Sequence, residues 1–294
     1  MMTATEKLVV IHADDLGMSH SANLAFAELT RLGVCGSGSV MVPCPWFPEI
    51  AAMARQDVSL DIGVHLTLTS EMRHFRWRPL TRPSSSSGLV DDDGYFHRQP
   101  SKARRRAAPA AVEAELRAQI EAALAAGIDV THLDDHAGTV LAPEFCAIYI
   151  RLGLEYGLPI LITPDLASYG GLHNMEGVAP AAYGAQATAA EEAGFAIFDR
   201  IIETPWTAAT ATMDEYGRLF SGITPGRTFM ALHFAAPGDI EAIDPVMGHR
   251  RIGEYLLFRL PEFGQWLQST GLRLEGMRGL RAELRRRLAA RRSA

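Results

Sequence analysis

The chain of 294 residues is 48% hydrophobic and 21% charged, which is the composition of a folded globular protein rather than a disordered one. Its net charge of −6 excludes a general nucleic-acid binder, because such proteins need a basic face to release counterions from phosphates. The three cysteines form no Cys-x-x-Cys pair, and neither a secretion signal nor a membrane span is evident, so we expect a cytoplasmic protein without membrane contact.

Short apolar runs alternate with longer amphipathic segments along the chain. In chain order, the first half should contain a strand at Leu8–His12, a helix at Ser21–Leu32, a strand at Ser37–Val42, a helix at Phe47–Arg55 and a strand at Leu60–Thr69. After a long connection we expect a helix at Ala110–Ala126, a strand at Val130–Leu133 and a helix at Glu144–Tyr156. Strands at Pro159–Thr163, Arg200–Glu203 and Thr228–His233 should follow, and then a helix at Arg250–Leu267 with a break at Pro261. This alternation predicts right-handed β-α-β units and therefore an α/β fold. Its parallel sheet should have about seven strands and close into a barrel.

One segment interrupts the alternation. Residues 71–106 contain a serine run, three consecutive aspartates and several arginines, and a connection this long is usually functional or disordered. An Asp-Gly turn between Leu89–Val90 and Tyr95–Phe96 indicates a small hairpin within it. We expect residues 1–280 to form a single barrel carrying this insertion. Residues 281–294 should be a basic C-terminal tail, either a solvated helix or a frayed end.

Two adjacent carboxylates follow the first strand, in the sequence His12-Ala13-Asp14-Asp15-Leu16-Gly17. Like charges this close raise each other's pKa. A bound cation removes that cost, and it lets one acid be a ligand while the other stays free as a base. The alternative is that Asp14 or Asp15 only caps the next helix, a role that Ser19 or Ser21 can fill.

Histidines follow two other strands. His65 lies in Gly63-Val64-His65-Leu66-Thr67-Leu68-Thr69, and His136 ends the run His132-Leu133-Asp134-Asp135-His136. Taken alone, His65 is more often a hydrogen-bonded core histidine. Because the carboxyl ends of parallel strands meet at one rim of a barrel, these clusters can instead gather an aspartate and two histidines. That set suits zinc or another divalent metal.

A further histidine, His233, ends the last predicted strand in Leu232-His233-Phe234. The near-neutral pKa of an unperturbed imidazole suits it to protonate a leaving group. A strand-end residue hydrogen-bonded to the backbone is the alternative interpretation.

In combination, these motifs resemble the YdjC-like family, the ChbG-type carbohydrate deacetylases, from Leu8 to about Leu280. The resemblance implies a distorted (β/α) barrel related to polysaccharide deacetylases. It implies an enzyme that removes an acetyl group from an N-acetylated sugar with one divalent metal ion. Carried over residue by residue, the resemblance implies that Asp15, His65 and His136 are the metal ligands. It implies that Asp14 is the general base and that His233 is a proton donor or an orienting group.

Other residues are expected to assist these. Asp134, with His132 beside it, should orient the histidine ligands. Trp77, Tyr95 and Phe96 are the expected aromatic contacts of a sugar ring. We expect the metal to be zinc, with magnesium as the alternative, and residues 71–106 to form an ordered lid over the site or an arm to a second copy of the chain.

Three departures from the family's pattern concern the substrate side of the site. Ala137-Gly138-Thr139 stands where further histidines often follow, Pro159–Thr163 contains no arginine, and Phe234 replaces a common proline. The metal-binding motifs are kept while these positions have changed. The substrate therefore stays open between an N-acetylated sugar, a non-acetyl amide and an ester, and a sugar-binding barrel without catalysis is the alternative of another class.

Overall fold

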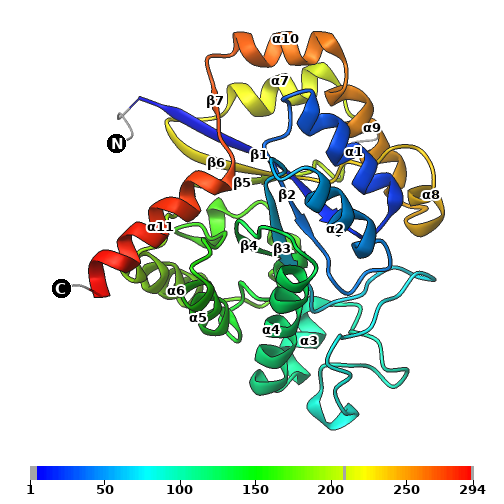
Figure 1. Ribbon diagram of the computed structural model, residues 1–294, viewed down its shortest axis with the longest axis vertical. Coiled ribbons are helices and arrows are strands. Elements are labelled where there is room, and N and C mark those ends of the chain that lie inside the picture. Colours follow the sequence, from blue (N-terminus) through cyan, green and yellow to red (C-terminus); the bar gives the residue numbers. More distant parts are fainter. Residues whose placement is uncertain (1–4, 208–209, 293–294) are drawn as a thin grey trace.

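Parallel strands alternate with helices along the chain, as the sequence pattern predicts (Figure 1). The computed structural model describes residues 5–207 and 210–292. Its strands are β1 (Lys7–Leu16), β2 (Ser37–Val40), β3 (Ile62–Leu66), β4 (Leu133–Asp135), β5 (Arg200–Glu203), β6 (Gly226–Leu232) and β7 (Arg273–Leu274). Its α-helices are α1 (His20–Arg31), α2 (Phe47–Gln56), α3 (Pro100–Arg106), α4 (Pro109–Ala125), α5 (Cys146–Tyr156), α6 (Pro180–Ala193), α7 (Met213–Ser221), α8 (Ile240–Ile243), α9 (Gly248–Phe258), α10 (Pro261–Ser269) and α11 (Met277–Arg292).

The sheet has the order β4-β3-β2-β1-β6-β5, with β7 pairing the start of β1, and all of these pairings are parallel. An irregular segment joins its two edges. Ile160 bridges to Leu133 in β4, and Tyr169 bridges to Ile201 in β5. The sheet therefore curls into a distorted (β/α) barrel, and the predicted fold class is confirmed.

The structure differs from the prediction in several details. The run Pro159–Thr163 makes a single bridge instead of a strand, because a proline at each side of Ile160–Thr163 cannot donate to a ladder. The strand predicted at Val130–Leu133 lies at Leu133–Asp135, so Asp134 and Asp135 belong to β4 itself. Helix α6 was missed because its buried face is mostly alanine and shows no apolar stripe.

The contacts at the start of α1 show whether the neighbouring aspartates cap this helix. The Ser19 side chain accepts a hydrogen bond from the backbone N of Ala22 at 3.0 Å. Asp239 accepts from the backbone N of His20 and of Ser21. These side chains satisfy the first free N–H groups of the helix. The capping alternative for the Asp14–Asp15 pair is therefore wrong, and both carboxylates are available for another role.

Residues 71–106 leave the barrel after β3 and are coloured cyan in Figure 1. Val90 and Phe96 form the antiparallel bridge of the predicted hairpin, and the backbone N of Asp91 donates to the carbonyl of Tyr95 at 2.8 Å. Leu89 and Phe96 are fully buried. The segment thus carries its own share of the hydrophobic core.

The basic C-terminal stretch is helical and docked. The boundary expected at residue 280 falls inside α11, and residues 293–294 lie outside the described residues. Arg281 donates to Asp129, while Arg285 donates to the carbonyl of Gly157 and Arg291 to that of Ala193. The last two contacts satisfy carbonyls at the ends of α5 and α6, where a positive charge is favourable.

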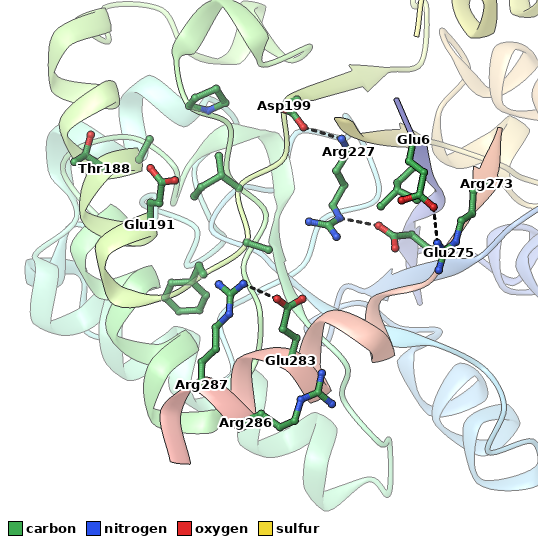
Figure 2. A pocket seen from close by; sticks show the side chains of 16 residues that line it. Glu6, Thr188, Glu191, Asp199, Arg227, Arg273, Glu275, Glu283, Arg286 and Arg287 are labelled. Carbon is green, nitrogen blue, oxygen red and sulfur yellow. Dashed lines mark hydrogen bonds and ion pairs between the residues drawn. The ribbon is translucent and has the colours of Figure 1, made fainter. Parts of the chain in front are cut away.

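A cavity of about 890 Å³ opens beside α11, near the amino ends of β1 and β6 (Figure 2). Two of its arginines pair with acids of the same cavity: Arg227 Nε lies 2.7 Å from Glu275 Oε1, and Arg273 Nη1 lies 2.9 Å from Glu6 Oε1. Among the described residues, no helix is both long enough and apolar enough to cross a bilayer.

Candidate metal and catalytic site

Asp14 and Asp15 lie at the carboxyl end of β1, and their side chains point in different directions. Its register against β2 shifts between Ala13 and Leu16, and Asp15 adopts a left-handed backbone with φ of 63°. This conformation costs a non-glycine residue on the order of 1–3 kcal/mol, and strain of this kind gathers at functional sites. Ala137, next to His136, has φ of 55°. Two of the three positive-φ non-glycine residues in the described chain therefore lie at this one place.

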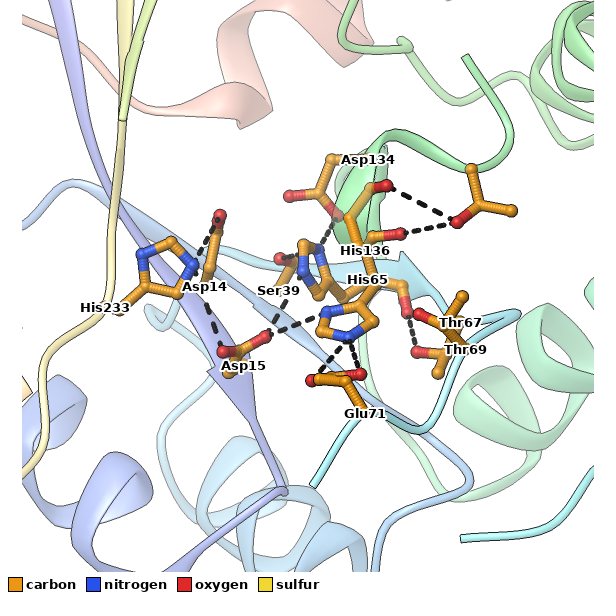
Figure 3. Close-up of polar contacts among 12 residues, drawn as sticks. Asp14, Asp15, Ser39, His65, Thr67, Thr69, Glu71, Asp134, His136 and His233 are labelled. Atoms are coloured by element: carbon orange, nitrogen blue, oxygen red, sulfur yellow. Dashed lines mark hydrogen bonds and ion pairs between the residues drawn. The ribbon is translucent and has the colours of Figure 1, made fainter. Parts of the chain in front are cut away.

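Three donor atoms converge here from three strand ends (Figure 3). Asp15 Oδ1 lies 3.4 Å from His65 Nε2 and 3.2 Å from His136 Nδ1. Asp15, His65 and His136 are 1%, 2% and 6% exposed, so water barely reaches them. The three ligands expected from the sequence are thus brought together as one group, with their donor atoms within 4.8 Å of one another.

The remaining nitrogen of each histidine faces a carboxylate. His65 Nδ1 lies 3.0 Å from Asp134 Oδ1. His136 Nε2 lies 3.1 Å from both oxygens of Glu71. A carboxylate only accepts, so each of these nitrogens carries the proton of its ring. The other nitrogens face Asp15, and with a metal ion in place of their protons they would offer it their lone pairs, an arrangement typical of histidines that bind a metal.

Buried oxygen atoms that lack a hydrogen bond indicate whether a cation would be stabilised at this group. Oδ1 of Asp14 and of Asp15 are buried and accept no hydrogen bond within the described residues. Burial lowers the pKa of His136, but the carboxylates of Glu71 and Asp15 raise it to about 10. Buried acceptors without donors are costly. The group therefore favours positive charge, and its one oxygen and two nitrogens are ligand atoms that a divalent metal accepts.

The two adjacent aspartates have opposite electrostatic environments. Burial raises the pKa of Asp14 well above its ordinary value. Burial acts in the same direction on Asp15, but the guanidinium of Arg251 and the imidazoles of His136 and His65 together outweigh it and hold the pKa of Asp15 well below its usual range. Arg251 Nη1 lies 2.7 Å from Asp15 Oδ2. Neighbouring acids whose pKa values are pushed apart are suited to different roles.

His233 lies across the two aspartates from His65 and His136 (Figure 3). Its Nε2 is 3.7 Å from Asp14 Oδ2 and 3.9 Å from Asp15 Oδ2. The ring is 8% exposed, and desolvation lowers its pKa well below the ordinary value. An uncharged imidazole thus borders the carboxylates on the side away from the proposed ligands.

Asp134 lies behind His65, and His132 Nε2 lies 3.9 Å from Asp134 Oδ2. Asp134 accepts from His65, and its Oδ2 lies 3.1 Å from His12 Nε2. His132 is fully buried against Gly63, where a Cβ would come within 2.5 Å of the ring. His12 is also within 3.3 Å of Asp14 Oδ1, yet its role was not predicted. The available signal was its position two residues before Asp14, on the same face of β1.

The aromatic residues expected to bind a sugar are instead engaged in packing within the protein. Phe96 is fully buried and Trp77 is 2% exposed, so neither ring offers a face to a ligand. Trp77 instead packs 6.2 Å from the His136 ring and donates to the carbonyl of Thr69 at 2.8 Å. Tyr95 lies under the guanidinium of Arg78, 4.2 Å from its ring centre. These side chains stabilise the segment and the back of the site.

Three residues near the site had no assigned role in the sequence analysis. Glu71 had only a weak signal, its place shortly after β3. Arg251 and Trp206 had none, because they come from distant parts of the chain. The Trp206 ring lies 4.6 Å from that of His233 and 5.3 Å from the guanidinium of Arg251. Trp206 is partly exposed and is thus an aromatic side chain at the edge of the site.

Comparisons with known proteins identify the family of the chain. A sequence model of the family described as YdjC-like protein matches residues 8–269. A carbohydrate deacetylase of Thermus thermophilus is 40% identical over 164 residues, 56% of each chain. One of Brevibacillus brevis is 33% identical over 152 residues, 52% of this chain and 58% of the relative. The chain thus aligns with little more than half the length of these curated relatives.

A solved structure from Enterococcus faecalis, named as a cellobiose-phosphate cleavage protein, has the same fold. It superposes with a TM-score of 0.75 at 22% identity, and the alignment covers 94% of this chain and 99% of that one. At this identity the likeness concerns the fold alone.

Proposed function

Because this chain belongs to the YdjC-like protein family, we propose that it is a metal-dependent deacetylase of N-acetylated sugars. The match to the family model confirms the family that the motifs resemble. The observation that carries the proposal is the convergence of Asp15 Oδ1, His65 Nε2 and His136 Nδ1 beside the free carboxylate of Asp14. The name carbohydrate deacetylase of the Thermus and Brevibacillus relatives supports the substrate class.

The residues present fit one divalent ion. Asp15, His65 and His136 would hold it, with zinc favoured by the two imidazoles and magnesium as the alternative. When bound, such an ion polarises the amide carbonyl and makes a water molecule more acidic. Arg251 keeps Asp15 ionised, while Asp134 and Glu71 hold the two rings with their lone pairs toward the ion.

The chain's own groups account for the proton transfers of amide hydrolysis. Asp14 accepts the proton that the attacking water loses as the new C–O bond forms. His233 Nε2 takes up this proton from Asp14 and donates it to the sugar nitrogen as the C–N bond breaks. The products are acetate and a free amine. Asp14 Oδ2 and His233 Nε2 lie 3.7 Å apart, so both can reach one bound amide from neighbouring positions.

The edge of the site offers features that suit a sugar. The partly exposed ring of Trp206 lies beside His233, and aromatic faces pack well against the apolar side of a sugar. Glu203, at the end of β5, accepts a hydrogen bond from the Trp206 side chain and lies 3.6 Å from His173, so it is a polar side chain beside this ring. Because Trp77 and Phe96 are buried, we assign the aromatic contact to Trp206.

A substrate panel tests the proposed activity. Purified protein loaded with Zn²⁺ or Mg²⁺ is incubated with N-acetylglucosamine, diacetylchitobiose, an O-acetylated sugar and an N-acetylated amino acid. We expect equal amounts of acetate and free amine from at least one N-acetylated sugar, measured by coupled acetate assay and amine labelling. The Asp14→Asn variant in the same assay is the control for contaminating activity.

Two results would contradict the proposal. Hydrolysis restricted to the ester would make the protein an esterase. Tight sugar binding without turnover in the metal-loaded protein would make it a sugar-binding barrel.

A further inference from the structure

We propose that Thr204 and Glu254 are positioning residues that fix which nitrogen of His233 carries the proton in the neutral ring. The structure assigns the proton to Nδ1 and leaves Nε2 as the nitrogen that exchanges protons with the substrate. The inference rests on the proposed function only in taking His233 as the proton donor. The hydrogen-bond pattern itself can be measured without any substrate.

Glu254, in the middle of α9, is completely buried behind His233. Its Oε2 lies 3.0 Å from the hydroxyl of Thr204 and 3.1 Å from the backbone N of His233, and its Oε1 contacts the hydroxyl of Tyr216. Burial raises the pKa of Glu254 above its ordinary value, and these donors and the charge of Arg250 offset part of the rise. We take Glu254 as ionised. An ionised carboxylate has only acceptors, so each of its three neighbours donates to it.

The hydroxyl of Thr204 transmits this requirement to the ring. Thr204 Oγ1 lies 2.9 Å from His233 Nδ1. Because its single proton is directed at Glu254, the oxygen can only accept from the ring nitrogen. Nδ1 therefore bears hydrogen. The opposite orientation would place lone pairs of Thr204 and Glu254 3.0 Å apart with no proton between them.

The nitrogen without a proton, Nε2, then faces the place of the proposed reaction. His233 Nε2 is directed at Asp14 and Asp15, 3.7 and 3.9 Å away, where the amide nitrogen of a substrate would be protonated. When the ring is protonated, the negative charge of Glu254 stabilises it through Thr204. A buried carboxylate that orients a catalytic histidine acts in the same way in serine proteases, although there it contacts the ring directly.

Selective ¹⁵N labelling of histidine tests the arrangement in the protein as it stands. Long-range ¹H–¹⁵N spectra distinguish a ring protonated at Nδ1 from one protonated at Nε2, and a His233→Asn variant assigns the signal. We expect wild-type His233 to carry its proton on Nδ1. Thr204→Val removes the hydroxyl while keeping the shape, so it should lose this preference. Thr204→Ser keeps the hydroxyl and should retain it.

Kinetics give a second readout. Thr204→Val should lower kcat by roughly 10–100-fold with KM within about twofold, because an orienting partner is lost while the substrate contacts stay. Thr204→Ser should restore most of the rate. Thr163→Val is the matched control. It also removes a buried hydroxyl that is hydrogen-bonded, here 2.9 Å from Tyr183, and should change neither the tautomer nor kcat.

Several outcomes would overturn the inference. One is a wild-type ring protonated on Nε2, which needs no variant to detect. Another is a Thr204→Val protein that keeps the Nδ1 proton and the wild-type rate, or a Thr204→Ser protein as impaired as Thr204→Val. If no N-acetylated sugar is hydrolysed, the proposed function fails while the ¹⁵N spectra still decide the role of Thr204.

Discussion

The two ends of the barrel both gather charged side chains, but they pair them differently. At the amino ends of the strands, the 890 Å³ cavity has arginines and acids that neutralise one another, as in Arg227 with Glu275. At the carboxyl ends, Asp14 and Asp15 each keep a buried oxygen without a hydrogen bond within the described residues. The cavity thus contains ion pairs of its own, whereas the buried oxygens at the carboxyl ends favour an additional positive charge. Charge that no neighbouring side chain balances is what distinguishes the candidate site from the cavity.

The strongest test of this comparison removes the shared ligand atom. We expect Asp15→Asn to lose bound metal and all detectable activity, because the amide cannot replace the charge between His65 and His136. Metal content by elemental analysis and acetate release measure this. Asp199→Asn is the matched control at the opposite end, where Asp199 accepts from the backbone N of Arg227. Full metal occupancy in Asp15→Asn would remove it from the ligand set.

The next effect separates base from ligand. Asp14→Asn should keep its metal and lose roughly 10²–10⁴-fold in kcat, which is the usual contribution of a general base. Elemental analysis and steady-state kinetics on the same preparation check both parts. A near-normal rate would exclude Asp14 as the base, and loss of metal would make it a ligand.

A smaller effect is expected where the 71–106 segment meets the site. Glu71→Gln weakens the acceptor for His136 Nε2 and should lower metal affinity by about 10–100-fold. Titration of the metal-free protein with Zn²⁺ measures it. Glu275→Gln provides the control, because its carboxylate belongs to the amino-end cavity. Equal affinity in Glu71→Gln and the wild type would show that Glu71 only covers the site.

The smallest effect is expected at the amino-end cavity. Arg227→Gln breaks a partly exposed ion pair with Glu275, and such pairs contribute at most about 1 kcal/mol. We expect a slightly lower Tm and an unchanged kcat/KM. A large loss of activity would mean that the two ends of the barrel are coupled, and the contrast between them would fail.

Local patterns in the sequence were sufficient for much of the fold. Alternating apolar runs predicted the parallel sheet, and Pro261 correctly predicted the boundary between α9 and α10. Pattern failed where it was weak. Helix α6 has a buried face made mostly of alanine and therefore shows no apolar stripe. The two residues of β7 are too few to show the alternation of a strand. Those elements exist because the rest of the barrel supplies surfaces for them to pack on.

The sequence by itself also determined that Asp15, His65 and His136 would meet, because parallel strands end at one rim. Their roles stay predictions. Only the tertiary structure decided the surroundings: Arg251 reaches Asp15 across 236 residues, and Glu254 reaches Thr204 across 50. The reason is physical. Strand ends follow from local periodicity, whereas these contacts depend on how α9 packs against the sheet, which no short-range pattern encodes.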